Sequence, residues 1–389
     1  MLEEVKGIQT ESSTASQASS YRSIFKATSL FGGVQVFIIL IQIIKSKIVA
    51  VLLGPLGVGI QGLYQSALDL IKQITSLGIA QSAVRDVAEA HGSGDFQRIS
   101  RIVTVLRKIV WGTGLLGLIA VVVFSPLLSK ASFGDYKYIV AFLFLAIVPL
   151  LEQLSAGQKV ILQGTRRLKD LAKASAIGAT AVLVVSAPLY YFFGTKGIIP
   201  TMILSAVVAL IASWYYSKRI EIDKVRLTFK DVLTEGRGMM VMGISMSVTG
   251  IMTMGTAFVI RSLMRQWGGT EEVGLFQAGF VMINSYVGLV FNAMTTDYYP
   301  RLAAANKDNA KCREVVSKQG EISVYLLAPL LTLCIVAMPL VIRILYSEQF
   351  LPVDGFIKWC CIGMMFRLSS WLMSFMFVAK AESKLFVLN

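Results

Sequence analysis

The sequence has few charged residues for its length. Of its 389 residues, 15% are Asp, Glu, Lys or Arg, whereas a soluble domain carries about 25%. Hydrophobic residues make up 55% of the chain, and the mean hydropathy is +0.67. These values exclude an ordinary soluble domain and predict an all-α polytopic membrane protein.

The sequence also lacks the groups from which most enzyme and metal sites are built. There is one histidine, His91, and the four cysteines show no metal-ligand spacing. No phosphate-binding loop of the form GxxxxGK(S/T) is present. Ser155 lies near Glu152, but no histidine or lysine completes a nucleophile–base pair there. We therefore expect no catalytic residues, no metal site and no cofactor, and a function other than that of an enzyme.

No signal peptide precedes the first apolar run. Residues 1–22 are polar and rich in Ser, Thr and Gln, which predicts a disordered cytoplasmic tail. The formal net charge of +14 could indicate nucleic-acid binding. The Lys and Arg residues instead concentrate in alternate loops between apolar runs, which is typical of cytoplasmic loops beside an anionic leaflet. We therefore predict no nucleic-acid partner.

The sequence contains ten apolar runs, each long enough to cross about 30 Å of hydrocarbon as a helix. They are expected near 27–53, 60–84, 102–128, 138–162, 172–193, 197–216, 238–267, 272–302, 322–345 and 353–378. Residues 384–389 look like the beginning of a further span. The predicted organisation is a tail (1–22), an N-terminal transmembrane lobe (23–216), a basic cytoplasmic linker (217–237) and a C-terminal transmembrane lobe (238–389). The loop charges predict a cytoplasmic N-terminus.

An internal repeat relates the first two spans to the seventh and eighth. Lys47 lies seven residues before Gly54, and Arg261 lies seven residues before Gly268. The offset covers six spans, an even number, so the two copies have the same orientation in the membrane. This is the parallel repeat of a two-lobed transporter built from six-helix halves, with the substrate site between the lobes. An alternative interpretation is chance similarity between glycine-rich turns.

Charged residues within the apolar runs are the main candidates for function, because each costs a few kcal/mol at the bilayer centre. Lys47, Arg261 and Arg367 are predicted to give a cavity between the lobes a positive potential that attracts an anion such as a phosphate. The alternative is that they pair with acids purely for stability. Lys45 is two residues from Lys47, so we expect only one of the two to face a lumen.

Acidic and amide groups within the spans complete the candidate site. Asp69 and Lys72 are three residues apart on one helix, which favours a structural ion pair, while Asp69 or Glu152 could instead carry a coupling ion. Polar residues of the eighth apolar run are expected to face protein or a watery lumen. They are Gln277, Asn284 and Asn292.

Four short motifs occur in order along the chain: LLGPLGVG at 52–59, EVGLFQ at 272–277, TDYYPR at 296–301 and AKA at 379–381. In these the sequence resembles bacterial O-antigen flippases of the Wzx type, within the multidrug/oligosaccharidyl-lipid/polysaccharide exporter superfamily. The resemblance implies two six-helix lobes, a cationic lumen, and movement of an undecaprenyl-pyrophosphate-linked oligosaccharide to the outer leaflet. It also implies membrane lipids, a glycan polymerase and a chain-length regulator as partners. About twelve spans are expected of this family, so we predict a truncated second lobe.

Two other functions are consistent with the sequence. A cation-coupled multidrug exporter of the same superfamily would prefer unpaired carboxylates in its lumen, whereas basic residues dominate the spans here. A structural membrane subunit of a glycan assembly complex would need no charged interior. Dye efflux and a transport assay would separate these alternatives from a flippase.

Overall fold

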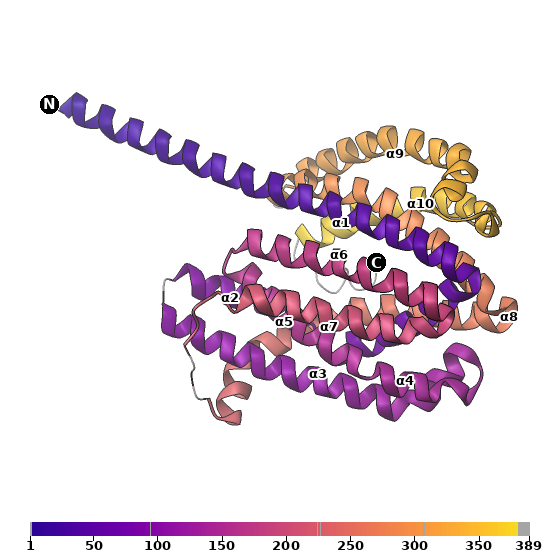
Figure 1. Ribbon diagram of the computed structural model, residues 1–389. Helices are drawn as coiled ribbons and strands as arrows, with labels where there is room; N and C mark the ends of the chain where they lie inside the picture. Colours follow the sequence, from indigo (N-terminus) through magenta and orange to yellow (C-terminus); the bar gives the residue numbers. More distant parts are fainter. Residues whose placement is uncertain (1, 94, 224, 226, 306–307, 380–389) are drawn as a thin grey trace.

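The structure is a computed structural model that describes residues 2–93, 95–223, 225, 227–305 and 308–379, and in this part it is helical with no strand (Figure 1). The α-helices are α1 (Leu2–Thr75), α2 (Ile79–Gly92), α3 (Phe96–Phe133), α4 (Ile139–Leu145), α5 (Ile147–Gly164), α6 (Leu168–Phe193), α7 (Ile198–Ser217), α8 (Phe229–Ala305), α9 (Asn309–Leu345) and α10 (Val353–Ala379). The short 3-10 helices are η1 (Tyr136–Tyr138), η2 (Gly194–Gly197) and η3 (Glu348–Phe350). The prediction of an all-α fold is confirmed.

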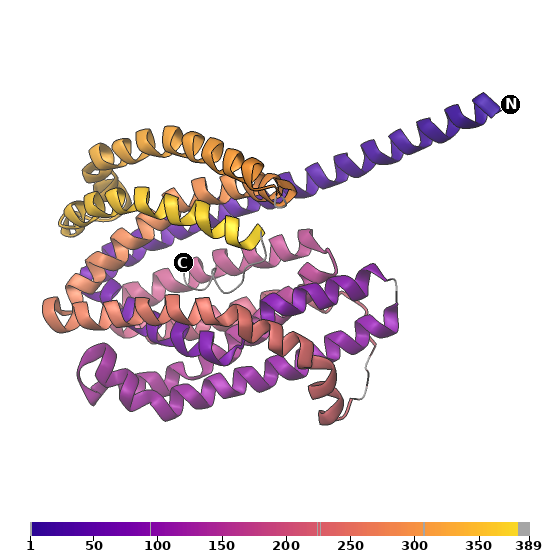
Figure 2. The ribbon, with the colours of Figure 1, turned by 180° about the vertical axis from the view of Figure 1, so that it is seen from behind.

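The two longest helices, α1 and α8, are each divided by a glycine into two arms. Gly54 has φ 64° and ψ −173°, and Gly269 has φ 84° and ψ 179°, a conformation that glycine adopts readily and other residues rarely do. A straight helix of 74 residues would be about 110 Å long, several times the thickness of the hydrocarbon core. The chain instead turns back at each glycine, as Figure 2 shows for α8. We call residues 33–53 and 55–75 the first and second arms of α1, and residues 230–268 and 270–305 those of α8.

The two glycine turns contact each other reciprocally. Gly59 packs so closely on the carbonyl group of Thr270, and Gly274 on that of Pro55, that a Cβ at either glycine would collide with the oxygen. The same offset of 215 positions relates Pro55 to Thr270 and Gly59 to Gly274. Reciprocal contact between equivalent residues is what a local two-fold axis produces. Glycine allows it because no side chain separates the two backbones.

This offset shifts the predicted repeat by one residue. The sequence pattern matches Gly54 with Gly268, but the residue with the equivalent backbone conformation is Gly269. When the two halves are aligned by the structure, Lys47 and Arg261 are therefore offset by one position and are not equivalent. One residue corresponds to about 100° around a helix. The two cations consequently point in different directions relative to their own arms.

The long helices α3 and α9 of the two halves are also counterparts. α3 has 38 residues and α9 has 37, and each follows an aspartate that caps it. The side chain of Asp95 accepts two backbone N–H groups from the first turn of α3, and Asp308 does the same for α9. The similarity of the halves thus extends beyond the glycine turns.

The helices form two lobes that meet along α1 and α8. In the N-terminal lobe, α3 to α7 pack around the second arm of α1, with Leu63 and Tyr64 in the core. In the C-terminal lobe, α9 and α10 pack with the second arm of α8, where the hydroxyl of Tyr298 donates to the carbonyl of Leu372 at 3.0 Å. Figure 1 places α9 above α1 and α3, α5 and α7 below it, with α10 passing behind α1. The first arm of α8, which the predicted division assigns to the C-terminal lobe, packs Val232 into the N-terminal lobe.

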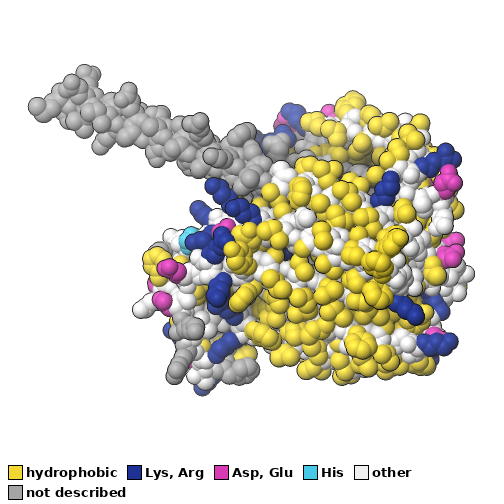
Figure 3. Space-filling view, in the orientation of Figure 1, with side chains coloured by type: hydrophobic (Ala, Val, Ile, Leu, Met, Phe, Trp, Pro, Cys, Tyr) yellow, Lys and Arg dark blue, Asp and Glu magenta, His cyan; other side chains and the backbone are white. Residues whose placement is uncertain are grey.

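Six helical stretches of the described residues are long and apolar enough to cross a membrane. They are Gly33–Thr75, Phe96–Phe133, Tyr136–Gly164, Leu168–Ser217, Ser247–Asn284 and Asn309–Leu345. The predicted ten spans and truncated second lobe are therefore not confirmed. The numbers differ partly because the first stretch holds both arms of α1 and the fourth holds α6 and α7. Exposed apolar side chains form a broad face on the bundle (Figure 3), and the chain is a multi-pass membrane protein.

Two helix boundaries differ from the expectation. The second predicted span (60–84) ends at Thr75, because Gly78, with φ 60°, separates α1 from α2. The stretch 85–101, expected as a loop, is instead largely helical, because α2 extends to Gly92 and α3 begins at Phe96. Residues 2–22, predicted as a tail, form the beginning of α1, which projects from the bundle in Figure 1.

Candidate functional site

A cavity of about 470 Å³ lies where the two lobes meet, between both arms of α1, the second arm of α8 and the end of α9. The polar residues that line it are Gln42, Lys45, Ser46, Gln61, Gln65 and Gln277. Tyr346 and apolar residues such as Val49 and Val281 form the rest of the wall. No Asp or Glu is among its lining residues in the described part of the chain. The cavity therefore offers one cation and several amides to a ligand.

Helical spacing explains why these polar residues share a wall. Gln42, Lys45 and Ser46 are separated by three and four positions and so lie on one face of the first arm of α1. Gln61 and Gln65 are four positions apart and form the matching face of the second arm. The turn at Gly54 brings the two faces together around the cavity.

Lys45 is half-buried in this wall, and no described residue forms an ion pair with it. Lys47 is exposed, and its Nζ donates to the carbonyl oxygen of Ile344 at 2.6 Å, in the last turn of α9. A cation there offsets the negative end of the helix dipole and its unpaired carbonyls. Of the two lysines, only one of which was expected to face a lumen, Lys45 lines the cavity.

Arg261 is held by an amide of the cavity wall. Its Nε and Nη2 donate to Oε1 of Gln277 at 3.0 and 2.7 Å, and its Nη1 donates to the carbonyl of Ala257 at 2.9 Å. The guanidinium is buried and lies 5.5 Å from the ring centre of Phe276. Because the oxygen of Gln277 is engaged by Arg261, the amide nitrogen is left to donate elsewhere. Arg261 thus stands directly behind the cavity and keeps its full charge.

Arg367 has a similar neutral partner. Its Nη1 donates to Oδ1 of Asn284 at 2.8 Å, which joins α10 to the second arm of α8, and its guanidinium lies 6.0 Å from the ring centre of Phe291. Arg367 is exposed and does not line the cavity. The side chain of Asn292 lies outside the described residues, so its predicted place in the lumen is a prediction only.

The acidic candidates gather around Lys72 inside the N-terminal lobe. Nζ of Lys72 lies 2.6 Å from Oε2 of Glu152 on α5 and 3.2 Å from Oδ1 of Asp69. Gln65 donates its Nε2 to the same Asp69 oxygen at 3.1 Å. Asp69 and Lys72 form the ion pair expected from their spacing, and Glu152 extends it. Through Gln65, this network reaches the wall of the cavity.

The sequence analysis did not single out four of the polar lining residues, Gln42, Ser46, Gln61 and Gln65. A signal for them exists in the helical spacing, since polar residues recur every three or four positions within two apolar runs. The glycine turn between the runs hides the signal, because it decides which face of one arm opposes which face of the other. The structure brings Arg261 together with Gln277, and Arg367 with Asn284, but it does not bring Lys47 to the cavity.

The chain is similar in sequence to known proteins. The family model described as "Polysaccharide biosynthesis protein" matches residues 48–354. The lipid III flippase of Escherichia coli (strain K12) is 20% identical over 351 residues, which cover 89% of this chain and 83% of the relative.

Solved structures of transporters share the fold. An inward-facing multidrug resistance MATE family transporter of the MOP superfamily has a TM-score of 0.72 at 16% identity, covering 90% of this chain and 82% of that one. A MOP superfamily transporter from Pyrococcus furiosus, described as having a binding pocket of reverse polarity, has a TM-score of 0.57 at 17% identity, covering 93% of this chain and 82% of that one. These likenesses show that the chain shares its fold with solved transporters.

Proposed function

The chain belongs to the polysaccharide biosynthesis protein family, and on this premise we propose that it flips a lipid-linked oligosaccharide across the bacterial inner membrane. The substrate class is an undecaprenyl-pyrophosphate-linked glycan, such as an O-antigen repeat unit. The cavity between the lobes is the site through which the polar part of this substrate passes. The proposal extends to a cytoplasmic N-terminus, and to a glycan polymerase and a chain-length regulator as partners.

The composition of the cavity wall is the observation that carries this proposal. Lys45 contributes a positive charge without an acidic partner in the described residues, and the buried Arg261 adds a second charge behind Gln277. A pyrophosphate requires such cations, and low-dielectric walls strengthen their attraction for it. The amides of Gln42 and Gln61 can both donate to and accept from sugar hydroxyl groups, and the amide nitrogen of Gln277 can donate to them.

Movement of the lobes relative to each other would expose the cavity alternately to each side. At Gly59 and Gly274 the lobes meet backbone to backbone, with no side chain between these two glycines. Such a contact supports rocking of the two halves, as in transporters built from parallel repeats. Asp69 and Glu152 remain candidates for coupling to an ion gradient, because one ammonium serves both carboxylates.

The decisive experiment compares two neighbouring lysines. In a bacterium deleted for its own O-antigen flippase, Lys45→Gln and Lys47→Gln are each expressed, and lipid-linked glycan that reaches the outer leaflet is measured. We expect Lys45→Gln to reduce export by about 10-fold or more, since a charge-assisted hydrogen bond is lost, and Lys47→Gln to reduce it much less. Equal export by both variants, at equal abundance in the membrane, would refute the role of the cavity.

A cation-coupled multidrug exporter is the second candidate, and the MATE-like fold is the observation that favours it. Such a protein would bind cations near carboxylates, and Glu152 and Asp69 provide two around Lys72. Binding and efflux of a cationic dye, both lost in Glu152→Gln, would support this function. Dye efflux indistinguishable from that of empty vesicles would exclude the multidrug-exporter function.

A further inference from the structure

A second cavity, of about 460 Å³, opens on the N-terminal lobe between α3, α5 and the end of α7, away from the contact between the lobes. We propose that it holds the headgroup phosphate of an anionic phospholipid. The residues that line it are Leu106, Arg107, Val110, Trp111, Leu154, Gly157, Gln158, Trp214, Ser217, Lys218, Ile220 and Ile222. Two cations and two indole rings thus surround one hollow, and no Asp or Glu lines it in the described residues.

The charges in this cavity are available to an external anion. Arg107 on α3 and Lys218 just beyond α7 are both exposed, and neither forms an ion pair with a described residue. Nζ of Lys218 lies 5.2 Å from the ring centre of Trp214, which directs the ammonium along the indole face. An arginine fork beside an ammonium matches a phosphodiester, since both donate charge-assisted hydrogen bonds.

A neutral donor completes the headgroup site. Oγ of Ser217 donates to Oε1 of Gln158 at 2.5 Å, so the amide nitrogen of Gln158 is left to donate to a ligand. Gly157 contributes no side chain, and a Cβ there would press on Val110 of α3. The small residue keeps α3 and α5 close, and their surfaces form the floor of the hollow.

The cavity lies at the depth where lipid headgroups are expected. Trp111 is 52% exposed and Trp214 is 51% exposed, and indoles of this kind concentrate at the membrane–water interface. Exposed apolar side chains continue from them along α3 and α7, with Leu115 and Ile211 among them. An acyl chain can therefore lie on this surface while its phosphate occupies the cavity. The mixture of charge and indole favours a lipid over a soluble anion, which has no use for the apolar surface.

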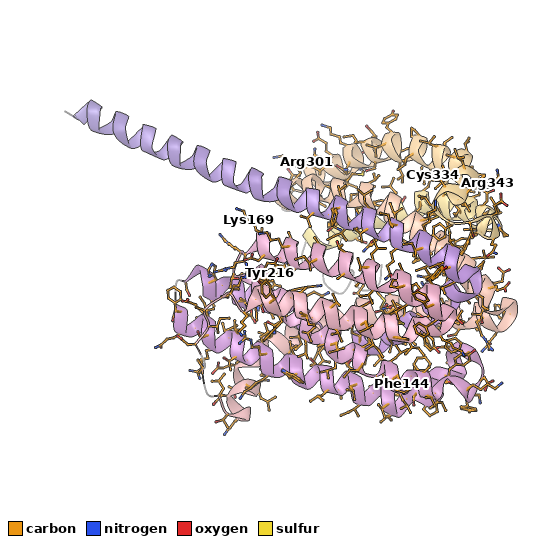
Figure 4. All side chains as sticks on the ribbon, in the orientation of Figure 1. Phe144, Lys169, Tyr216, Arg301, Cys334 and Arg343 are labelled. Carbon is orange, nitrogen blue, oxygen red and sulfur yellow. The ribbon has the colours of Figure 1, made fainter. Side chains whose placement is uncertain are left out.

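The boundary between the hydrophobic face and the polar end of the molecule is visible in the figures. In Figure 3, Lys and Arg side chains gather where the broad hydrophobic face gives way to the polar end of the molecule. Figure 4 labels Tyr216 and Lys169 at this end, whereas Phe144 lies toward the other. The basic linker follows α7 here, so the cavity is on the side predicted to be cytoplasmic, where basic pockets between helices bind anionic headgroups.

The test measures lipid retained by the full chain in nanodiscs of phosphatidylglycerol and phosphatidylcholine. After exchange into detergent, native mass spectrometry counts each lipid on the wild type, on the double variant Arg107→Gln/Lys218→Gln, and on Lys130→Gln/Lys137→Gln. The last variant removes the same charge from the opposite end of α3 and the loop that follows it. We expect the first double variant to hold phosphatidylglycerol about 30-fold more weakly and the second to match the wild type.

The charge-conserving variant Arg107→Lys/Lys218→Arg should retain phosphatidylglycerol, which separates loss of charge from loss of folding. On the wild type, brominated phosphatidylglycerol should quench indole fluorescence more than brominated phosphatidylcholine, and Trp111→Phe/Trp214→Phe should remove that excess. Equal retention of the two lipids, unchanged retention by Arg107→Gln/Lys218→Gln, or release of the lipid by millimolar inorganic phosphate would each overturn the proposal, the last because the occupant would then be a soluble anion.

Discussion

Cations within the helices have different partners in the two halves of the chain. In the N-terminal lobe, Lys72 lies between Asp69 and Glu152, so two negative charges surround one positive charge. In the C-terminal half of the chain, Arg261 on the first arm of α8 and Arg367 on α10 donate to the neutral amides of Gln277 and Asn284. An amide orients a guanidinium through hydrogen bonds without cancelling its charge, whereas a carboxylate does both.

This difference separates a structural role from an electrostatic one. With two carboxylates around one ammonium, the Lys72 network carries no net positive charge, and its hydrogen bonds tie α1 to α5. The two arginines keep their charges, and Arg261 does so while buried behind the cavity. An inward-facing cation with a neutral partner is therefore a stronger sign of an anion path than one with an acid beside it. Four predictions, in order of decreasing expected effect, test this comparison.

The largest effect is expected from Gln277→Glu, which makes the C-terminal arrangement resemble the N-terminal one. The new carboxylate keeps the hydrogen bonds of Arg261 but cancels its charge. We expect export of lipid-linked glycan to fall by about 10- to 100-fold, since hydrogen bonds to charged groups are worth about 1.5–3 kcal/mol. The measurement is the export assay in the flippase-deleted bacterium. Gln319→Glu, which also adds an acid beside an arginine but outside the cavity, is the control, and equal export by the two variants would contradict the prediction.

The next effect concerns the contact that the lobes share. Gly59→Ala and Gly274→Ala each place a methyl group against a backbone carbonyl of the other helix. Because the contact is reciprocal, we expect the two variants to lose similar stability, about 2–3 kcal/mol each. Thermal unfolding in detergent measures this loss. Gly33→Ala and Gly288→Ala, which have open space around them, are the matched controls, and unequal losses for Gly59→Ala and Gly274→Ala would argue against the local two-fold axis.

A smaller effect is expected when the cation of the N-terminal lobe is removed. Lys72→Met leaves the carboxylates of Asp69 and Glu152 facing each other without compensation. The side chains are about one-third exposed, so we expect a loss of about 1–2 kcal/mol rather than the larger cost of a fully buried pair. Denaturation in detergent measures it. Arg85→Met, which breaks the exposed pair with Asp86, should change stability by well under 1 kcal/mol, and a similar loss in both variants would show that the network adds no specific stability.

The smallest effect is expected from Asn284→Asp, which gives Arg367 an acidic partner. Arg367 is exposed and does not line the cavity, so solvent screens the change. We expect export to fall by roughly 3-fold, far less than in Gln277→Glu. The same export assay checks it. A loss as large as that of Gln277→Glu would place Arg367 on the substrate path and make the two arginines equivalent.

Much of the fold could be predicted from the sequence, but less of the site. Apolar runs and glycine turns predict the helices, and the positive φ at Gly54 and Gly269 accounts for the turns. The pair Asp69–Lys72 follows from local spacing along one helix. The partners of Arg261 and Arg367 could not be predicted, because Gln277 lies 16 positions from Arg261 and Asn284 lies 83 positions from Arg367.

The sequence alone does not decide whether Lys45 or Lys47 lines the cavity. Their spacing establishes that they point in different directions, but it does not say which direction is inward. The inward direction depends on how the first arm of α1 is rotated against α9. There the carbonyl oxygen of Ile344 accepts a hydrogen bond from the ammonium of Lys47. The one-residue shift of the repeat has the same origin, since Gly268 and Gly269 are alike in sequence and only the backbone distinguishes them.

Without a structure, the sequence already indicates a helical, multi-pass membrane protein of the polysaccharide biosynthesis family with cations within its apolar runs. Hydropathy, loop charge and helical spacing are local properties that need no knowledge of the fold. Tertiary structure alone decided which cations are neutralised, which retain their charge and which line a cavity. These outcomes depend on contacts between helices remote in the chain, because the energy of a charge at membrane depth is set by the groups packed against it.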